Sequence, residues 1–381
     1  MTHHAFHIGL NAQLLSLSRS YRGAGISWYI FNLLQRLPAV SPDFRYTAFL
    51  HDRAFSQPSL NLEFTRFPTH RPMARILWEQ TVLPWLLQKK QVDLLHALAF
   101  VAPLAGPRPW VVTVYDLSFL RYPDAFRPFN RWYLKTFTAR SVQRARAVIA
   151  ISESTRQDVI RLLKVPAERV HTVYCGVDSQ FRPLPPAEVE TFRVTRGLPE
   201  TFILFLGTLE PRKNVAGLLK AYARWKQAEP DAPPLVIAGG KGWYYEQIFA
   251  LVETLGLADS VHFPGYIPQE ELVLWYNAAT IFVYPSHFEG FGLPVLEAMA
   301  CGTPVITSTA ASLPEVAGTG GAAWLVDPAD TEALTDALLS LYHQPDRRAA
   351  MAQAGRRRAA RFNWQTTAQQ TVDVYRKVLS P

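Results

Sequence analysis

The most informative segment of this sequence is YPSHFEGFGLPVLEAMACGTPVI, residues 284–306. Its middle predicts a short helix over Pro294–Ala300, because proline suits a first helical turn and Gly302 suits the position after the last one. Glu289 then lies in the loop before the helix, and Glu297 lies within it. A bare pair of glutamates at this spacing fits an ordinary solvated crossover, but the complete string is far more specific.

A second segment, GTLEPRKN at residues 207–214, connects an expected strand, Thr201–Leu206, to an expected helix, Val215–Gln227. Arg212 and Lys213 thus stand at the amino end of a helix, where the helix dipole disfavours cations. A bound anion would offset that cost, and arginine beside lysine suits a diphosphate. The alternative interpretation is a basic turn without a ligand.

Apolar runs alternate with helical patterns along the whole chain, which is typical of parallel sheets wound with helices. In the first half we expect strands at Phe6–Leu10, Arg45–Phe49, Leu94–Ala97, Trp110–Tyr115, Ala147–Ile151 and Arg169–Val173, and helices at Ile26–Leu37, Ala74–Gln88, Phe129–Ala145 and Glu153–Leu163. Pro84 is expected to kink or break the second of these helices. In the second half we expect further strands at Pro234–Ala238, Ser260–Phe263, Thr280–Tyr284 and Pro304–Thr307, and a helix at Gln269–Asn277.

Three expected strands of the second half end in glycine, at Gly207, Gly239 and Gly265. Ligands of open α/β sheets bind at the carboxyl ends of the strands, and glycine lets the backbone approach a ligand closely. The amino end of the helix beside Gly292 and Leu293 adds backbone N–H groups that favour a phosphate. These features predict a phosphate-containing ligand on the second half of the chain.

A proline-rich stretch, FRPLPP at residues 181–186, separates the two halves. Its prolines remove backbone donors, so the stretch cannot pair as a central strand. The length of 381 residues also exceeds that of an ordinary single α/β core. We therefore expect two domains, 1–178 and 179–363, followed by a helical segment at 364–381.

The net charge of +8 is concentrated in the first half. Residues 1–175 carry 22 Lys and Arg against 10 Asp and Glu, a net charge of +12, and the remainder carries a net charge of −4. A membrane surface, a phosphorylated lipid or nucleic acid could attract such charge, which could equally serve solubility alone. No nucleic-acid-binding motif accompanies it.

The sequence shows neither a signal peptide nor an apolar run long enough to span a membrane. Its two cysteines, Cys175 and Cys301, do not form a disulfide framework in a chain of this size. We therefore expect a cytoplasmic protein.

The string at residues 284–306 resembles the signature of glycosyltransferase family 4, whose members are retaining nucleotide-sugar enzymes with the GT-B fold. The resemblance covers most of the chain, is strongest from Phe202 to Pro328, and is weak over residues 40–90. It implies an α/β protein with two Rossmann-like domains facing a cleft. The first would bind the acceptor and the second the nucleotide sugar, and the last helix would pack back on the first domain.

Carried over to this chain, the resemblance implies that Glu289 holds hydroxyls of the donor sugar and that Glu297 holds the nucleotide ribose. The backbone amides of Phe291, Gly292 and Leu293 would hold the sugar and the diphosphate.

Other positions also match the family pattern. Gly23 and Gly25 match a glycine loop that approaches the donor diphosphate, although they lack the third glycine of a dinucleotide fingerprint. Gly207 and Gly239 would line the donor site, and Tyr266 would lie beside the nucleotide base.

One position departs from the pattern, because many members have histidine where this chain has Tyr115. That histidine helps to orient the donor sugar, whereas tyrosine can hydrogen-bond but cannot act as a base near neutral pH. Asp116 is expected either to contact a sugar hydroxyl or to cap the next turn. His96 is interpreted as a buried structural histidine.

The expected activity is metal-independent, retaining glycosyl transfer with Arg212, Lys213 and Glu289 as the catalytic residues. The chain has no Asp-x-Asp motif, which holds a divalent cation in the other large fold of sugar transferases, so we expect the two cations to stabilise the leaving diphosphate without metal or other cofactor. The alternatives are a sugar-nucleotide epimerase of the same fold and a noncatalytic nucleotide-sugar-binding protein.

The donor is expected to be GDP-mannose, with UDP-glucose next, because the chain resembles bacterial surface-polysaccharide mannosyltransferases. A saccharide or a lipid-linked molecule would accept the sugar. Between Arg121 and Arg146, seven basic residues alternate with aromatic ones. This pattern predicts either peripheral contact with an anionic membrane or a helix with its rings in the core.

Overall fold

The computed structural model describes residues 5–17, 25–106, 109–123, 126, 128–240, 242 and 245–380. The chain forms two compact units. Unit 1 comprises Met1–Gly176 and Asn363–Pro381, and unit 2 comprises Val177–Phe362. These divisions lie within two residues of those expected at 178 and 363.

Within the described part of unit 1, seven parallel strands form one sheet in the order β3-β2-β1-β4-β5-β6-β7. They are β1 (His7–Asn11), β2 (Arg45–Leu50), β3 (Asn61–Phe64), β4 (Leu94–Ala97), β5 (Trp110–Val114), β6 (Ala147–Ala150) and β7 (Val170–Thr172). The strand order reverses between β1 and β4, which are paired in register from Ile8 with Leu94. The sequence did not predict β3, a short edge strand without a buried residue.

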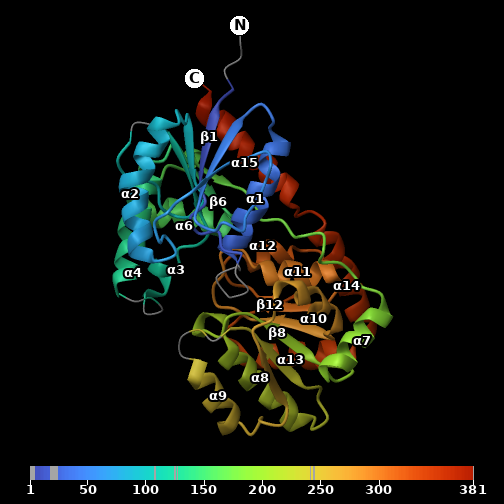
Figure 1. The fold of residues 1–381 in the computed structure, drawn as a ribbon. Coiled ribbons are helices and arrows are strands. Elements are labelled where there is room, and N and C mark those ends of the chain that lie inside the picture. The colour runs from blue at the N-terminus through green and yellow to red at the C-terminus, as the bar shows by residue number, and fades with distance from the viewer. Residues whose placement is uncertain are drawn as a thin grey trace. The chain divides into compact units, whose positions relative to one another are not determined.

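The helices of unit 1 follow the expected alternation with strands, as Figure 1 shows. They are α1 (Ile26–Val40), α2 (Pro72–Lys89), α3 (Ser118–Arg121), α4 (Pro128–Tyr133), a π-helical segment at Leu134–Thr138, α5 (Ala139–Arg144) and α6 (Glu153–Leu163). The break expected at Pro84 was wrong, because α2 continues through it. Leu83 and Leu87 are both buried in the core, so packing stabilises the helix on both sides of Pro84.

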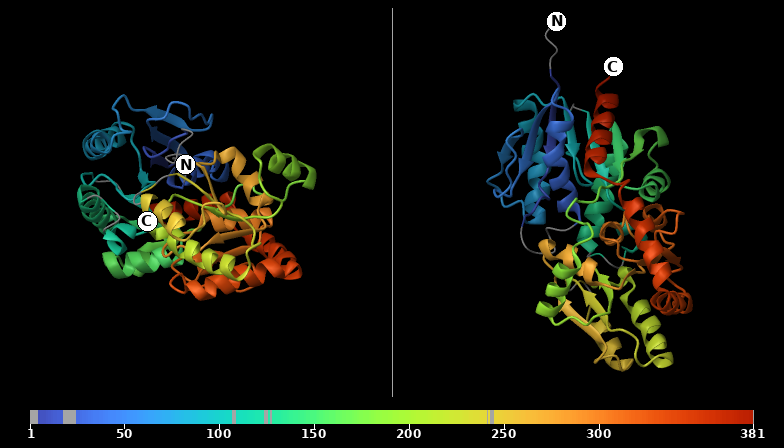
Figure 2. Two further views of the ribbon diagram at one scale, coloured as in Figure 1. Left: turned by 90° about the horizontal axis from the view of Figure 1, so that it is seen from below. Right: turned by 90° about the vertical axis from the view of Figure 1, so that its right-hand side faces the viewer.

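The last helix, α15 (Trp364–Leu379), belongs to unit 1 and packs against α1, as expected. In Figures 1 and 2 it is the red helix beside the blue α1. The Asn363 side chain caps it by accepting from the Thr366 amide at 2.8 Å. The Tyr375 hydroxyl lies 2.6 Å from Nδ1 of His96, and burial lowers the pKa of that histidine to about 3. His96 is therefore a structural residue of the core.

The described part of unit 2 contains six parallel strands in the order β10-β9-β8-β11-β12-β13. They are β8 (Ile203–Leu206), β9 (Leu235–Ala238), β10 (Val261–Gly265), β11 (Ile281–Tyr284), β12 (Val305–Ser308) and β13 (Trp324–Val326). The helices are α7 (Pro186–Arg196), α8 (Val215–Ala228), α9 (Tyr245–Thr254), α10 (Leu272–Ala278), α11 (Leu293–Cys301), α12 (Leu313–Ala317), α13 (Thr331–His343) and α14 (Pro345–Ala359). The strand order reverses between β8 and β11.

Among the described residues, no helix has both the length and the apolar character that crossing a bilayer requires. Cys175 and Cys301 are both buried and form no disulfide.

Candidate active site

The two motifs of unit 2 meet where its strand order reverses. β8 leads into the segment that contains Arg212 and Lys213, and its neighbour β11 leads into the segment that contains Glu289. Ligands of doubly wound sheets bind at such a reversal, outside the carboxyl ends of the strands. The topology therefore brings together residues that are more than 70 positions apart in the sequence.

A buried ion pair forms the centre of this site. Nζ of Lys213 lies 2.6 Å from Oε1 of Glu289 and 2.7 Å from the hydroxyl of Tyr284. The Ser286 hydroxyl donates to the same carboxylate oxygen at 2.6 Å. Lys213 and Glu289 are each only 8% exposed, so water does not screen their interaction.

The protonation of Glu289 follows from these contacts. Burial would raise its pKa, but the charges of Lys213 and Arg212 and the hydrogen bonds from Lys213 and Ser286 hold the pKa below its ordinary value. Burial lowers the pKa of the Lys213 ammonium, and the Glu289 charge opposes that change. The carboxylate is therefore ionised at neutral pH beside a cation.

Arg212 extends this cluster towards a second carboxylate. Its Nε and Nη2 lie 3.1 and 2.8 Å from Oε1 of Glu210, and its Nη1 donates to the Phe288 carbonyl at 3.2 Å. Nη1 is also 3.8 Å from Oε2 of Glu289. The guanidinium is thus oriented by several groups at once, and two cations face two carboxylates.

The local backbone explains why Arg212 and Lys213 project here. Pro211–Lys213 forms one 3-10 turn, and Asn214 adopts the left-handed conformation with φ of 57° before α8 begins. The Asn214 side chain donates to the carbonyls of Pro285 and Pro328 at 3.1 and 2.7 Å. The turn is therefore fastened to the loop after β11.

The loop between Glu289 and α11 depends on Gly292, whose φ of 108° disfavours other residues. An added Cβ would also lie 2.6 Å from a Leu313 side-chain carbon. The Ser312 hydroxyl lies 2.9 and 2.8 Å from the carbonyls of Glu289 and Phe291 and fixes the loop from the other side. The helix begins at Leu293, one residue before the expected start.

Glu297 lies within α11 and is 6% exposed. The Tyr276 hydroxyl donates to its Oε2 at 3.0 Å. Burial, with the Asp178 charge adding to it, raises the pKa of Glu297 to about 8. Glu297 is therefore mostly protonated at neutral pH, in contrast to Glu289.

The glycines at the strand ends allow close backbone packing. Gly239 has φ of 146°, and a Cβ there would lie 1.8 Å from the Gly207 carbonyl oxygen. The Gly239 amide donates to the Gly265 carbonyl at 2.8 Å, which links the ends of β9 and β10. Tyr266 follows directly and is 40% exposed, so its ring is accessible.

The residues expected to act from the first half have mixed outcomes. Gly23 lies outside the described residues. Gly25 precedes α1 with φ of 54°, a conformation that favours glycine.

The Tyr115 hydroxyl donates to the Leu98 carbonyl at 2.6 Å from within the core, so we do not retain Tyr115 as a substrate residue. Asp116 accepts from the amide and hydroxyl of Ser118 at 2.9 and 2.6 Å and caps that turn.

Unit 1 has its own polar cluster near the carboxyl end of β1. Nδ2 of Asn11 donates to Oε1 of Glu79 at 3.1 Å, and the Thr69 hydroxyl donates to Oε1 of Gln13 at 2.6 Å. Burial raises the pKa of Glu79. Within the part of the chain that the structure describes, Oδ1 of Asn11 and Nε2 of Gln13 are buried without a hydrogen-bond partner.

Sequence reasoning missed the residues that orient the site in unit 2: Tyr284, Ser286, Glu210, Tyr276 and Ser312. Three of them lie inside or beside the two recognised motifs, so proximity to the motifs was the available signal. Their roles depend on contacts between distant segments, which spacing alone does not predict.

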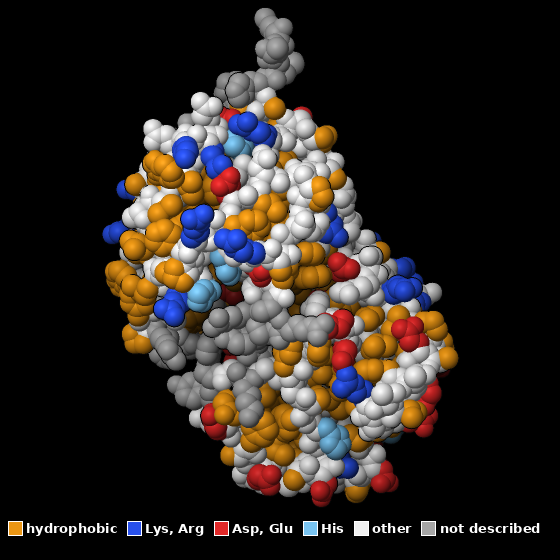
Figure 3. All heavy atoms as spheres, viewed as in Figure 1, with side chains coloured by type: hydrophobic (Ala, Val, Ile, Leu, Met, Phe, Trp, Pro, Cys, Tyr) orange, Lys and Arg blue, Asp and Glu red, His pale blue; other side chains and the backbone are white. Residues whose placement is uncertain are grey.

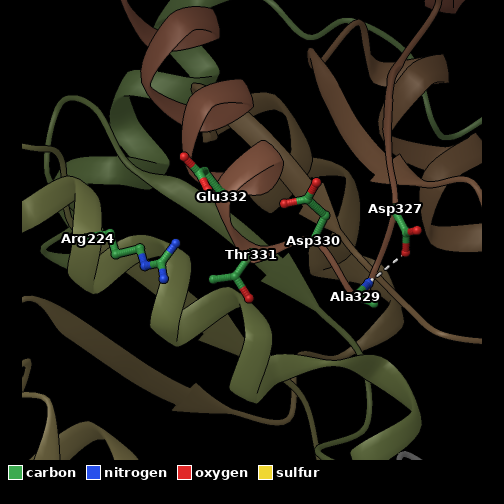
Figure 4. Close-up of a pocket in the computed structure, with 6 residues that line it drawn as sticks. All are labelled: Arg224, Asp327, Ala329, Asp330, Thr331 and Glu332. Atoms are coloured by element: carbon green, nitrogen blue, oxygen red, sulfur yellow. Dashed lines mark hydrogen bonds between the residues drawn. The ribbon is translucent and has the colours of Figure 1, made fainter.

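A separate hollow of about 500 Å³ lies on unit 2 beside α8 and the start of α13. Figure 4 shows the residues that line it, Arg224, Asp327, Ala329, Asp330, Thr331 and Glu332. Asp330 caps α13 and Asp327 accepts from the Ala329 amide, so both carboxylates have structural roles. None of the expected site residues lines this hollow.

The chain is similar to known proteins along most of its length. Residues 23–181 match the family model described as Glycosyltransferase Family 4, and residues 188–358 match the model described as Glycosyl transferases group 1. The O-antigen chain mannosyltransferase B of Escherichia coli is 31% identical over 373 residues, which cover 93% of this chain and 97% of that protein. A D-inositol 3-phosphate glycosyltransferase of Frankia alni is 38% identical over 244 residues, which cover 61% of this chain and 59% of that protein.

The fold has a match among solved structures. The sucrose-phosphate synthase of Thermosynechococcus elongatus superimposes with a TM-score of 0.79 at 24% identity, covering 98% of this chain and 99% of that one. The fold is therefore GT-B, with two Rossmann-like domains, and the chain belongs to glycosyltransferase family 4.

Proposed function

We propose that this chain is a retaining, metal-independent hexosyltransferase that uses a nucleotide diphosphate sugar as donor. The observation that carries the proposal is the buried cluster of Arg212, Lys213 and Glu289 at the strand reversal of unit 2. Cations held in low dielectric interact strongly with an anion and need little reorganisation during reaction. The diphosphate of the donor is an anion of the kind that such a cluster stabilises.

The charges of the cluster balance as it stands, and we propose that the diphosphate engages its two cations. In this structure Arg212 faces Glu210 and Lys213 faces Glu289. Negative charge that develops on the leaving diphosphate would be stabilised by both cations, while Glu210 keeps the guanidinium oriented. Arginine presents a fork of donors for such contacts.

The two glutamates have different proposed partners. Glu289, an ionised acceptor, holds hydroxyls of the donor sugar, and Glu297 holds the ribose. The protonated state of Glu297 suits a ribose hydroxyl, because a carboxylic acid can both donate and accept. The backbone of Phe291, Gly292 and Leu293 contributes donors at the amino end of α11.

The acceptor is proposed to bind unit 1 at its own strand reversal. Asn11 and Gln13 offer amide groups there, and Glu79 is a carboxyl whose pKa burial raises. The amide side chains of Asn11 and Gln13 suit the hydroxyls of a saccharide better than they suit a phosphate. The acceptor hydroxyl attacks the face from which the diphosphate leaves, and a donor phosphate oxygen takes its proton.

GDP-mannose is the first proposed donor and UDP-glucose the second. The near full-length similarity to a mannosyltransferase of O-antigen supports mannose. The enzyme would act in the cytoplasm, in surface polysaccharide or glycolipid synthesis, on a saccharide or lipid-linked acceptor. The basic segment 121–146 would contact the anionic inner face of the membrane.

A thermal-shift screen against nucleoside diphosphates tests the donor. A ligand at about 100 times its dissociation constant adds roughly 2.7 kcal/mol to stability, which is a measurable shift. We expect GDP to shift the melting temperature most. Stabilisation by no nucleoside diphosphate would contradict the proposal.

Donor turnover separates the alternatives. Slow hydrolysis of GDP-mannose, accelerated by an acceptor, is expected of a transferase. An epimerase would release an altered sugar nucleotide without acceptor, and a noncatalytic protein would leave the donor intact.

Calorimetry with bare GDP tests the division of roles between the glutamates. Glu297→Gln is expected to weaken GDP binding, whereas Glu289→Gln is expected to leave it nearly intact and to depress sugar transfer. Equal loss of GDP affinity in the two variants would refute the division.

A further inference from the structure

Helix α2 carries large apolar residues both in the core and at the surface. One face packs into the core of unit 1 through Trp78, Leu83 and Leu87. The other exposes Met73, Leu77 and Trp85, which are 62%, 60% and 56% accessible to water. Met73 and Leu77 are four residues apart and Trp85 is eight further on, so all three lie along one side of the helix. A surface helix of a globular protein normally carries polar residues on that side.

Neighbouring segments extend this exposed apolar surface. Phe67 precedes α2 and is 49% exposed, and Phe129 and Trp132 of α4 are 45% and 56% exposed. Helix α4 lies against α2, because the Tyr133 hydroxyl hydrogen-bonds with the carboxyl of Glu79. Six of the eleven large exposed apolar side chains in the described residues thus belong to this region. We call it the α2–α4 face.

The charges around the α2–α4 face are almost all positive. Its exposed basic residues are Arg66, Arg71, Lys89, Arg131 and Lys135. The only acid in residues 65–92 is Glu79, which is buried, and residues 126–146 contain none. Figure 3 shows orange and blue side chains mixed on the flank of unit 1 where α2 and α4 lie.

We propose that the α2–α4 face docks on an anionic lipid membrane. Tryptophan, leucine and methionine side chains enter the interface between headgroups and acyl chains, while lysine and arginine beside them meet anionic headgroups. Lys89 illustrates the pairing, because its Nζ lies 4.8 Å from the centre of the Trp85 ring. The positive charge, with no exposed acid among the described residues of 65–92 and 126–146, favours a lipid surface over a protein partner.

This inference rests on the membrane contact in the proposed function and extends its location. There the basic segment 121–146 carried the contact, whereas here α2 adds Met73, Leu77 and Trp85 to the exposed rings of α4. Of the aromatic side chains in that segment, Phe129 and Trp132 are exposed to water, whereas Tyr133 is buried in unit 1. Arg127 lies outside the described residues.

Vesicle co-sedimentation of the full chain tests the docking. We compare phosphatidylcholine vesicles with vesicles that contain phosphatidylglycerol, for the native chain and for Leu77→Glu/Trp85→Glu. The control is Val194→Glu, which places one glutamate, against two in the double variant, at a 70% exposed apolar residue of α7 in unit 2. Unchanged melting temperatures confirm that the variants fold.

The native chain and Val194→Glu are expected to bind the anionic vesicles, more weakly as salt rises, and the double variant is expected to bind at least tenfold less. Equal sedimentation of the native chain with both vesicle types at low salt, or undiminished binding of the double variant, would overturn the proposal. So would a native dimer in light scattering that the double variant abolishes, because a second copy would then cover the face.

Donor hydrolysis in the absence of vesicles separates this proposal from the proposed function. The double variant and the control should both retain the native hydrolysis rate. A native chain that binds vesicles but neither binds nor hydrolyses a nucleotide sugar would refute the proposed function while the docking stands.

Discussion

The two sheets carry different kinds of side chain at the points where their strand order reverses. At the β8/β11 reversal of unit 2, Arg212, Lys213 and Glu289 are charged, and their contacts are made within the cluster. Near the β1 side of the unit 1 reversal, Asn11 and Gln13 are uncharged, and each has one buried atom without a partner in the described residues. The same topology thus presents ions in one unit and neutral amides in the other.

The difference shows where the positive charge of the first half is located. Residues 1–175 carry a net charge of +12, but near the β1/β4 reversal the side chains of Asn11 and Gln13 are uncharged amides. Five of the exposed basic residues lie on the α2–α4 face instead, and others, such as Arg53, Arg161 and Lys164, lie elsewhere in unit 1. The positive charge of the first half is therefore associated with an exposed surface of unit 1. The anionic donor, in contrast, is proposed to bind unit 2, although residues 176–381 carry a net negative charge.

The largest expected effect is on the free energy of unfolding, which substitutions at the two strand reversals should change by different amounts. Glu289→Ala leaves the buried Lys213 without its partner and is expected to destabilise unit 2 by about 3–5 kcal/mol. Gln13→Met removes an amide whose nitrogen has no partner but whose oxygen accepts from the buried Thr69 hydroxyl, and is expected to cost about 1–3 kcal/mol, less than the loss at Glu289. Urea unfolding of both variants measures this. Similar losses of stability in the two variants would show that the ion pair at Glu289 contributes no more to stability than the hydrogen bonding of Gln13.

The next effect concerns the cation that is more accessible. Arg212→Ala is expected to lose charge-assisted hydrogen bonds worth about 1.5–3 kcal/mol, which corresponds to roughly a 10- to 150-fold fall in kcat/KM. The fold should survive, because Arg212 lies in a short turn at the surface of unit 2. Near-native rates in this variant would make Arg212 peripheral to the reaction.

A smaller effect depends on pH and on Glu297. The folded chain holds a proton there up to about pH 8, whereas the unfolded chain releases it near the ordinary value of 4.5. Between these values the folded state binds more protons, so the Glu297 contribution to stability declines as pH rises.

Glu297→Gln removes this dependence. Its stability relative to the native chain should increase from pH 6 to pH 7.5 by at most about 1.4 kcal/mol per pH unit. Thermal unfolding at several pH values measures the difference. A constant difference across this range would show that the pKa of Glu297 is not raised.

Much of the fold could be predicted from local patterns. The helix expected at Glu153–Leu163 matches α6 at both ends, because Ser152 caps its start and Lys164 adopts a left-handed conformation at its end. Buried parallel strands were found from continuous apolar runs. Edge strand β3 was missed because it has no buried residue, and the break at Pro84 was wrong because tertiary packing outweighs the lost hydrogen bond.

The candidate site was predictable only in part. Arg212, Lys213 and Glu289 were selected from two separate motifs, and the structure brings them together. Tyr284 was in the quoted string, but its contact with Lys213 spans 71 positions and needs the sheet order. The exposed side of α2 was missed because apolar residues at helical spacing usually indicate a buried face.

The central claim is that cationic side chains of unit 2, rather than a metal ion, stabilise the leaving diphosphate. The most direct measurement is the rate of sugar transfer from GDP-mannose in excess chelator, with and without added magnesium or manganese. We predict that the rate is unchanged within error by chelator and by either metal, because Arg212 and Lys213 supply the charge. A rate that vanishes in chelator and returns with magnesium or manganese would contradict it.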